Sequence, residues 1–234
     1  GISKFAPHFN WEDVPIKDKL QSEIKYPLLI DNDVRMMALT EKWEGRDDFI
    51  FINTGPGIGA AIVLGGELHY GRDWSAGEFG HMAIVEDGPR CSCGDHGCLE
   101  ALVSITRLVE KYYPELDSNL SFKKLREVWD NMIAQARTEK DESLDILKEA
   151  GQYLGTGIAN LVNLLNPEAI IVGGPFIEAE DILFPIIKDL VQKKSLRVPS
   201  REIKIETTGF GKQVGAIGAG IMVLQEIFKL KGGS

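Results

Sequence analysis

One histidine and three cysteines lie close together in the chain: His81, Cys91, Cys93 and Cys98. Their spacing is His-x9-Cys-x-Cys-x4-Cys, and three thiolates with one imidazole are an established tetrahedral set for structural zinc. Two thiolates one residue apart can face a single ion only if the backbone turns, and Gly94 and Gly97 provide that freedom. Because four protein ligands leave no position for a reactive water, the sequence predicts a structural zinc rather than a catalytic one.

Two alternatives to this ligand set come from the same segment. The cysteines could be incidental reduced thiols on a loop, although their clustering argues against that. His96 is a rival to His81 as the nitrogen ligand, but it lies inside the cysteine loop, where its side chain is constrained. The odd number of cysteines also argues against a disulfide framework and favours a reducing, cytoplasmic setting.

A second polar group, Asp31-Asn32-Asp33, lies between an apolar run and a predicted helix. One of these residues could simply cap the helix by accepting an amide hydrogen bond. Alternatively, polar groups at the carboxyl end of a strand could bind a ligand. Asn32 suits a sugar hydroxyl because an amide both donates and accepts, and Asp33 could act as a general base. The residues alone leave the two interpretations about even.

Two glycine-rich turns could approach a phosphate closely. The first, Thr54-Gly55-Pro56-Gly57-Ile58-Gly59, offers backbone amides to an anion. It is not a P-loop, since no Gly-Lys-Ser/Thr follows, and it is not a dinucleotide fingerprint, since a strand follows where a helix should. A tight connection between two strands explains it slightly better. The second, Gly173-Gly174, ends another predicted strand and is explained equally well by a plain turn.

The elements that must position these residues form a mixed pattern. Apolar runs predict strands at 27–30, 49–52, 60–64, 67–70, 169–172 and 203–206. Helical spacing predicts helices over 17–24, 34–43, 142–165, 181–194 and 214–230, with broken helical pieces from 99 to about 137. The breaks fall at Pro114 and Asp117, and residues 5–14 are predicted to form a loop. This order predicts an α/β fold with a mixed sheet and helices.

Composition excludes several classes of protein. With 234 residues, of which 44% are hydrophobic and 26% charged, the chain is predicted to fold around a sizeable core. No apolar run approaches the ~20 residues that a membrane span needs. The net charge of −9, without a basic stripe, predicts a poor nucleic-acid binder, because phosphate contacts need clustered Lys and Arg.

Several segments together resemble the ROK family, which contains bacterial sugar-sensing repressors and sugar kinases. Ala76-Gly-Glu-Phe-Gly-His81 followed by Cys91-Ser-Cys-Gly-Asp-His-Gly-Cys98-Leu-Glu100 matches the family signature in ligand spacing, in glycines and in the final Glu. Segments 30–35, 54–59 and 163–174 fit the family in the same order, so the resemblance covers nearly the whole chain. It implies the actin-like, ribonuclease H-like fold.

The resemblance also implies roles for individual residues. The sugar hydroxyls would be surrounded by Asn32, Asp33, Glu78, His81 and Glu100. His81 would bind zinc through one ring nitrogen and face the sugar with the other, while the zinc would hold the loop that aims Glu78 and Glu100. In the kinases of the family, the residue at Asp33 is the base for attack on ATP. In that case ATP and magnesium would lie against Thr54, Gly55, Gly57, Gly59, Gly173 and Gly174.

The regulator and kinase branches remain alternatives. Val34-Arg35, where kinases more often have Ala and Asn, is typical of the regulators, and Pro56 removes an amide donor that tight phosphate binding would use. However, Asp33, the residue that would act as the base in phosphate transfer to the sugar, is present in this chain. We favour the sugar-binding effector domain of a transcriptional regulator. The alternatives are an ATP-dependent hexose kinase and a zinc-stapled interaction module with a degenerate sugar pocket.

The same resemblance predicts how the chain is organised. Residues 1–30 would be a remnant of the first lobe, 31–212 the second lobe with the sugar and zinc sites, and 213–234 a C-terminal helix that packs back on the first lobe. The family's Asp-Gly phosphate loop and the regulators' winged helix-turn-helix are not found in the sequence. We therefore expect an incomplete first lobe and DNA contacts only through a segment outside this chain. A homo-oligomer, either a dimer or a tetramer, is also expected, and no membrane partner.

Overall fold

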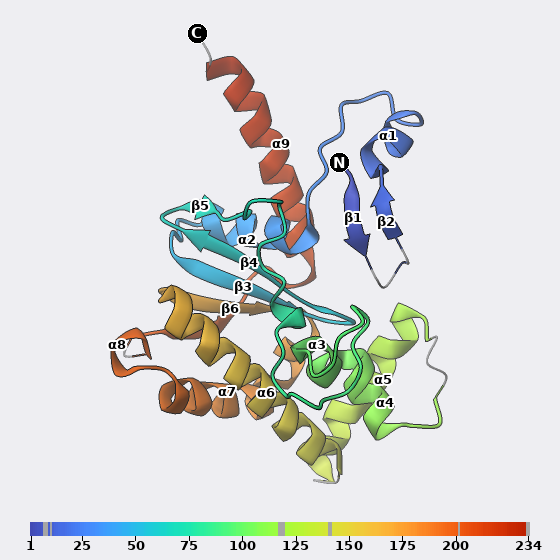
Figure 1. The fold of residues 1–234 in the computed structure, drawn as a ribbon, viewed down its shortest axis with the longest axis vertical. Helices are drawn as coiled ribbons and strands as arrows, with labels where there is room; N and C mark the ends of the chain where they lie inside the picture. The colour runs from blue at the N-terminus through green and yellow to red at the C-terminus, as the bar shows by residue number, and fades with distance from the viewer. Residues whose placement is uncertain (7–8, 10, 117–119, 140–141, 201, 233–234) are drawn as a thin grey trace.

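A five-stranded mixed sheet lies between two layers of helices in the computed structural model, which describes residues 1–6, 9, 11–116, 120–139, 142–200 and 202–232 (Figure 1). The strands are β3 (Phe49–Thr54), β4 (Ile58–Leu64), β5 (Glu67–Leu68), β6 (Ala169–Gly173) and β7 (Lys204–Thr207). They lie in the order β5-β4-β3-β6-β7. Because β3 pairs antiparallel with β4 and parallel with β6, the predicted mixed sheet is confirmed.

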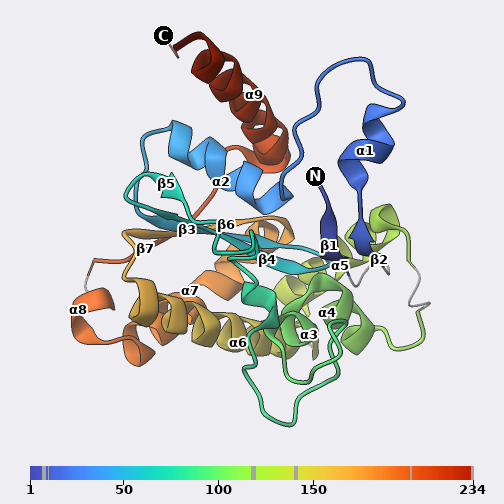
Figure 2. The ribbon, with the colours of Figure 1, turned by 45° about the horizontal axis from the view of Figure 1, so that its top comes forward.

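Helices cover both faces of this sheet (Figures 1 and 2). One face carries α2 (Asp33–Trp43) and α9 (Val214–Gly232). The other carries α3 (Leu99–Val103), α4 (Ile105–Tyr112), α5 (Phe122–Thr138), α6 (Glu142–Leu165) and α7 (Glu180–Lys194). Shorter helical elements include α8 (Arg197–Ser200), η2 (Phe79–His81), η3 (Pro175–Ala179) and η4 (Gly211–Gln213). No helix within the described residues is both long and apolar enough to cross a membrane.

Strand β3 is buried on both of its faces. Phe49 and Phe51 pack with α2 and the start of α9, whereas Ile50 and Ile52 pack with the helices of the opposite layer. All four side chains are at most 1% exposed. A strand covered on both faces needs apolar residues at every position. The signal for β3 in the sequence is therefore an unbroken apolar run and not an alternation of apolar and polar residues.

Most of the predicted elements are confirmed. Helix α6 has the predicted bounds, and α2, α7 and α9 agree with the predictions within two residues. Strand β4 begins two residues earlier than predicted, and β7 is shifted by one residue. Pro114 does lie between two helices, α4 and α5, whereas the break predicted at Asp117 lies outside the described residues.

Two predictions for the first thirty residues are wrong. The segment predicted as a loop contains β1 (Ser3–Ala6) and β2 (Trp11–Val14), which pair antiparallel in a sheet of their own before α1 (Ile16–Gln21). This hairpin buries neither of its faces, so no apolar alternation marks it in the sequence. No strand forms at 27–30, where Leu29 is 38% exposed. Apolar residues alone do not make a strand without a hydrogen-bonding neighbour.

The C-terminal helix α9 packs on α2. Met36 and Leu39 of α2 cluster with Ile221 of α9, and the buried Thr40 hydroxyl donates to the carbonyl of Val214 at 2.7 Å. Helix α2 lies within residues 31–212, the range predicted to form the second lobe. The division of the chain into lobes at residues 30 and 212 stays a prediction.

An ion pair between α5 and α7 gives the first testable expectation. Arg137 donates to both carboxylate oxygens of Asp181, at 2.6 and 3.1 Å, and to the carbonyl of Glu178 at 2.6 Å. The hydrogen bond from Arg137 holds the pKa of Asp181 below its usual value. We expect Arg137→Met to lower the free energy of unfolding by less than about 1 kcal/mol near neutral pH, because both side chains are half exposed to solvent.

The pH dependence of this effect has a definite sign. A carboxylate whose pKa is lowered on folding stabilises the fold above its unfolded pKa, and this contribution disappears as pH falls through the folded pKa. Urea unfolding of wild type and Arg137→Met should therefore converge in acid. A difference that persists unchanged below both pKa values would show that lost packing, not charge, causes it.

Candidate functional site

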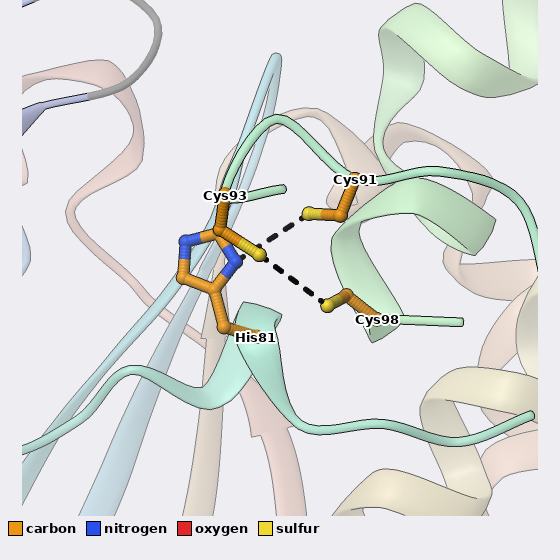
Figure 3. A group of neighbouring side chains, drawn as sticks. All are labelled: His81, Cys91, Cys93 and Cys98. Atoms are coloured by element: carbon orange, nitrogen blue, oxygen red, sulfur yellow. Dashed lines mark hydrogen bonds between the residues drawn. The ribbon is translucent and has the colours of Figure 1, made fainter. Parts of the chain in front are cut away.

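The four predicted metal ligands come together in the structure (Figure 3). His81 is the last residue of η2, and Cys91 and Cys93 lie in the loop that follows. Cys98 is the residue directly before α3. Their ligand atoms all lie within 4.8 Å of one another. The cluster takes its nitrogen from His81, while His96 is exposed and does not belong to it. The predicted ligand set is therefore brought together, with the histidine that the spacing favoured.

Two distances within the cluster fit a tetrahedral metal ion. Zinc–ligand bonds of about 2.3 Å to sulfur and about 2.0–2.1 Å to nitrogen place two sulfurs about 3.8 Å apart, and a sulfur and a nitrogen about 3.5 Å apart. The Sγ atoms of Cys93 and Cys98 are 3.7 Å apart, and His81 Nδ1 is 3.5 Å from Cys91 Sγ. Geometry and donor set both suit a metal, so the cluster can hold one.

Burial disfavours the thiolate form of Cys98. Burial, together with the hydrogen bonds that join it to Cys93 and Cys91, raises the pKa of the Cys98 thiol to about 12. A hydrogen bond from the backbone of Asp95 lowers the pKa of Cys93. Only a thiolate ligates a metal, so an ion bound here has to displace the proton from Cys98.

The cysteine loop turns on the glycines that the sequence singles out. Gly94 and Gly97 have φ angles of +100° and +69°, in the left-handed region that favours glycine. The turn is closed by the amide of Cys91, which donates to the carbonyl of Asp95 at 2.8 Å. A Cβ on Gly97 would lie 1.6 Å from the carbonyl oxygen of Val85, so this position accepts no side chain. The predicted role of both glycines is confirmed.

The segments that carry the predicted sugar-facing residues converge on the first residues of β4. Gly77 accepts a hydrogen bond from the amide of Ala60 at 3.1 Å, and a Cβ on Gly80 would lie 2.2 Å from the carbonyl oxygen of Ile58. The exposed Glu78 lies between these two close contacts, and His81 follows them. The loop that carries Glu78 and the predicted metal ligand His81 therefore packs closely against the sheet.

Helix α2 reaches the same place from the other layer. A Cβ on Gly59 would lie 2.9 Å from Val34 Cγ2, so the first turn of α2 lies directly on β4. This contact places the exposed Asn32 and Asp33, just before Val34, beside the strand that the Glu78 loop also touches. Two segments far apart in the sequence thus flank one strand end.

Asn32 and Asp33 have different local roles. Asn32 is the N-cap of α2, and its Oδ1 accepts from the amides of Val34 and Arg35 at 3.0 and 3.2 Å. Asp33 is the first helical residue, and its Oδ1 accepts from the amide of Val34 at 2.9 Å. The capping interpretation is thus correct for Asn32. Because the cap uses Oδ1, a ligand would meet the amide nitrogen of Asn32 and the exposed carboxylate of Asp33.

Glu100 joins the metal loop to β4. It is 6% exposed, and its Oε2 accepts from the amide of Ile58 at 3.0 Å. Its Oε1 accepts from the hydroxyl of Ser92 at 3.2 Å, and Ser92 lies between two of the metal ligands. Ser92 was not predicted as a site residue, and its only signal in the sequence is its position between Cys91 and Cys93. Asp31, predicted from the sequence as a possible cap or ligand-binding residue, instead pairs with Arg35, an ion pair that the i,i+4 spacing could have indicated.

The two glycine turns lie side by side. Strands β3 and β6 are parallel neighbours, and the buried Thr54 hydroxyl donates to the carbonyl of Gly173 at 2.8 Å and accepts from the amide of Phe176 at 3.1 Å. Gly174 has a φ of +85°, and a Cβ there would lie 1.8 Å from the carbonyl oxygen of Thr54. The first turn is also a tight connection between strands, as predicted, since Thr54 pairs with Ile58.

Comparison with known proteins agrees with this architecture. The model of the ROK family matches residues 2–226. A glucokinase of Halalkalibacterium halodurans is 33% identical over 97% of this chain and 72% of its own length. The xylose repressor of Caldicellulosiruptor bescii is 30% identical over 97% of this chain, which spans 59% of the repressor's length.

Solved structures of ROK-family proteins also resemble this chain. A ROK family transcriptional regulator homologous to Escherichia coli Mlc superposes with a TM-score of 0.78 at 30% identity, over 95% of this chain and 58% of the regulator. A ROK family glucokinase from Streptomyces griseus, in complex with glucose and AMPPNP, superposes with a TM-score of 0.75 at 28% identity, over 95% of this chain and 76% of the kinase. The predicted actin-like α/β fold and the predicted resemblance are both confirmed: the chain belongs to the ROK family.

Proposed function

We propose that the chain is the sugar-binding, zinc-stabilised effector domain of a ROK-family transcriptional regulator. The sugar would lie at the start of β4, between Asn32 and Asp33 on one side and Glu78, His81 and Glu100 on the other. Zinc on the four clustered ligands would fix the loop that carries His81 and tie it to Glu100 through Ser92. DNA would be contacted by a segment outside this chain, and the predicted dimer or tetramer stays a prediction.

The observation that carries the regulator over the kinase is the turn between β3 and β4. A turn that cradles phosphates needs N–H and O–H donors that face the ligand. Pro56 has no N–H, and Thr54 is only 1% exposed, with its hydroxyl bonded to Gly173 and Phe176. Two positions of the turn therefore cannot donate to a nucleotide, which supports a site that binds sugar without transferring phosphate.

In this proposal the sugar acts by changing the population of two conformations. A ligand shifts such an equilibrium only by its difference in affinity between the two states. Residues that approach the sugar from both sides of β4 would bind it best when they are close together, which favours the closed state. The DNA-binding part of the whole protein would then respond to that shift.

The second candidate is an ATP-dependent sugar kinase, and Asp33 is the observation that favours it. Its carboxylate is exposed at the first turn of α2, where it could accept a proton from a sugar hydroxyl. ATP and magnesium would then lie near Gly55, Gly57 and Gly59 and near Gly173 and Gly174. The 33% identity to a glucokinase gives this candidate weight.

One experiment separates the two candidates. The full-length protein is incubated with ATP, magnesium and a panel of D-glucose, D-xylose and N-acetylmannosamine, and ADP release is measured. The regulator predicts sugar binding by calorimetry without sugar-dependent ADP release. Turnover at the ordinary enzymatic scale of about 1–1000 s⁻¹ would reject the regulator. Absence of heat with every sugar would favour the interaction module.

Asp33→Asn should separate the chemistry of this residue from its structural role. An asparagine oxygen can still accept from the amide of Val34, so we expect zinc content to stay unchanged and stability to fall by no more than about 1 kcal/mol, the size of a lost helix-dipole interaction. If the protein is a kinase, ADP release should fall by about 10²–10⁴-fold. Asn32→Ala is the contrasting variant, because losing the cap costs about 1 kcal/mol. Global unfolding of Asp33→Asn would contradict the assignment of the cap to Asn32.

A further inference from the structure

Four side chains connect the start of α2 to the loop that leads to Glu78. Arg35 donates from Nε to Asp31 at 2.6 Å and from Nη1 to the carbonyl of Trp74 at 3.0 Å. Its guanidinium lies over the ring of Tyr70, 5.2 Å from the centroid, and the rings of Tyr70 and Trp74 are 4.4 Å apart. We call Asp31, Arg35, Tyr70 and Trp74 the Arg35 clasp.

The ion pair of the clasp is well shielded from water. The Asp31 and Arg35 side chains are only 7% and 12% exposed, whereas most ion pairs at the surface of this protein have at least one half-exposed partner. A shielded pair is stable only if its geometry is good and further hydrogen bonds satisfy the charged groups. The guanidinium meets that condition by binding a carboxylate, a carbonyl and an aromatic face at once.

The clasp holds a strained turn. Trp74 has a φ of +62°, a left-handed conformation that a bulky residue rarely adopts. Such a conformation persists only where surrounding contacts enforce it. Here Arg35 binds the carbonyl of Trp74 itself, and the amide of Ala76 donates to the carbonyl of Tyr70 at 3.0 Å to close the turn. The Trp74 side chain is 63% exposed, so packing of its ring into a core does not enforce the turn.

The two ends of the clasp lie next to the two halves of the candidate sugar site. Arg35 follows Asp33 by two residues, and Trp74 precedes Glu78 by four. The start of β4 lies between these halves, in contact with Val34 on one side and with Gly77 and Gly80 on the other. The Arg35–Trp74 hydrogen bond thus spans the two halves directly, without passing through β4.

We propose that Arg35 is a positioning residue for the sugar site, which fixes the Trp74 turn and thereby sets Glu78 and His81 relative to Asn32 and Asp33. This inference rests on the proposed function, from which it takes a sugar as the ligand. Arg35 does not touch the sugar in this arrangement. Its removal should therefore weaken sugar binding through mobility of the 70–81 segment, while the metal ligands and the fold remain.

The test compares Arg35→Met with Arg137→Met in the full chain. Arg137 is a matched control, since it too binds one carboxylate and one main-chain carbonyl, but it joins α5 to η3 and α7. For Arg35→Met we expect amides of residues 71–81 to exchange hydrogen at least about tenfold faster, and affinity for whichever of D-glucose, D-xylose or N-acetylmannosamine the wild type binds to fall about tenfold. For Arg137→Met both quantities should stay within about twofold of wild type. Metal content should be unchanged in both variants.

A lysine variant separates positioning from charge. Arg35→Lys keeps a positive charge beside Asp31 but lacks the planar fork that reaches the carboxylate and the carbonyl together, so intermediate exchange and affinity are expected. Unchanged exchange of residues 71–81 in Arg35→Met would overturn the proposal, as would faster exchange with unchanged sugar affinity. If the wild type binds no sugar, the proposed function fails and the role of Arg35 toward a sugar fails with it. The exchange result would still show whether Arg35 holds the turn.

Discussion

Replacing Cys93 with serine is expected to release the metal and to lower sugar affinity by at least about 100-fold. A neutral serine hydroxyl does not replace a thiolate ligand, and structural zinc contributes about 10–16 kcal/mol in small zinc peptides. Without the ion, the contact between His81 Nδ1 and Cys91 Sγ is only a weak sulfur hydrogen bond, and burial keeps the Cys98 thiol protonated. The loop that carries Ser92 would then lose its link to Glu100, and His81 would lose its fixed orientation.

Elemental analysis and calorimetry measure this prediction together. Cys93→Ser should contain less than about a tenth of a metal equivalent, against about one in wild type. His96→Ala is the matched control in the same loop, because its exposed side chain lies outside the cluster, and it should keep both metal and affinity. Wild-type protein stripped with a chelator gives a second route to the same state. Metal-free protein that stays compact and binds sugar normally would refute the role given to the metal.

Glu100→Gln is expected to preserve the fold and to lower sugar affinity by about 10–100-fold. A glutamine can still accept from the amide of Ile58 through its oxygen and donate to Ser92 through its nitrogen, so both protein contacts survive. What it loses is the negative charge, and hydrogen bonds to a charged group contribute about 1.5–3 kcal/mol. The affinity change therefore isolates the carboxylate as a ligand for sugar hydroxyls.

Glu100→Ala provides the contrast. It leaves the buried amide of Ile58 without its acceptor, which costs about 1–3 kcal/mol of stability in addition to the lost affinity. Ser92→Ala, which removes only the hydroxyl on Oε1, should change affinity much less than either Glu100 variant. If Glu100→Gln binds sugar as wild type does, Glu100 is a structural link between the metal loop and β4 and not a sugar ligand.

The ligand cluster could be predicted from the sequence because its members are close in the chain. A short segment has few ways to fold, and Gly94 and Gly97 limit them further. The same holds for the cap at Asn32, whose partners lie two and three residues away. Strand β3 was predictable because both of its faces are buried, so its apolar run is continuous.

The two wrong predictions in the first thirty residues concern segments whose structure does not follow from burial of apolar side chains. Apolar residues at 27–30 have the composition of a strand, but the five-stranded sheet offers them no neighbour, and Leu29 stays 38% exposed. The β1–β2 hairpin forms although Phe5 is 63% exposed. Because the hairpin buries neither face, its sequence does not show the alternation of apolar and polar residues that predicts a strand. Strand formation depends on a hydrogen-bonding partner, and apolar composition reports neither the absence of one at 27–30 nor the exposed pairing of β1 with β2.

The sequence by itself predicted the cluster of candidate metal ligands, the strands at the centre of the sheet, a possible cap at the start of α2 and, through its motifs, the family. Only the tertiary structure decided that segments 31–35, 77–81 and Glu100 meet at the start of β4, and that Arg35 ties two of them together. It also decided that the Thr54 hydroxyl is bonded to Gly173 and Phe176 rather than open to a nucleotide. The physical reason is the distance along the chain between the residues that interact. Periodicity, capping and ligand spacing arise from neighbours along the chain, whereas these contacts depend on how two helical layers pack against one sheet.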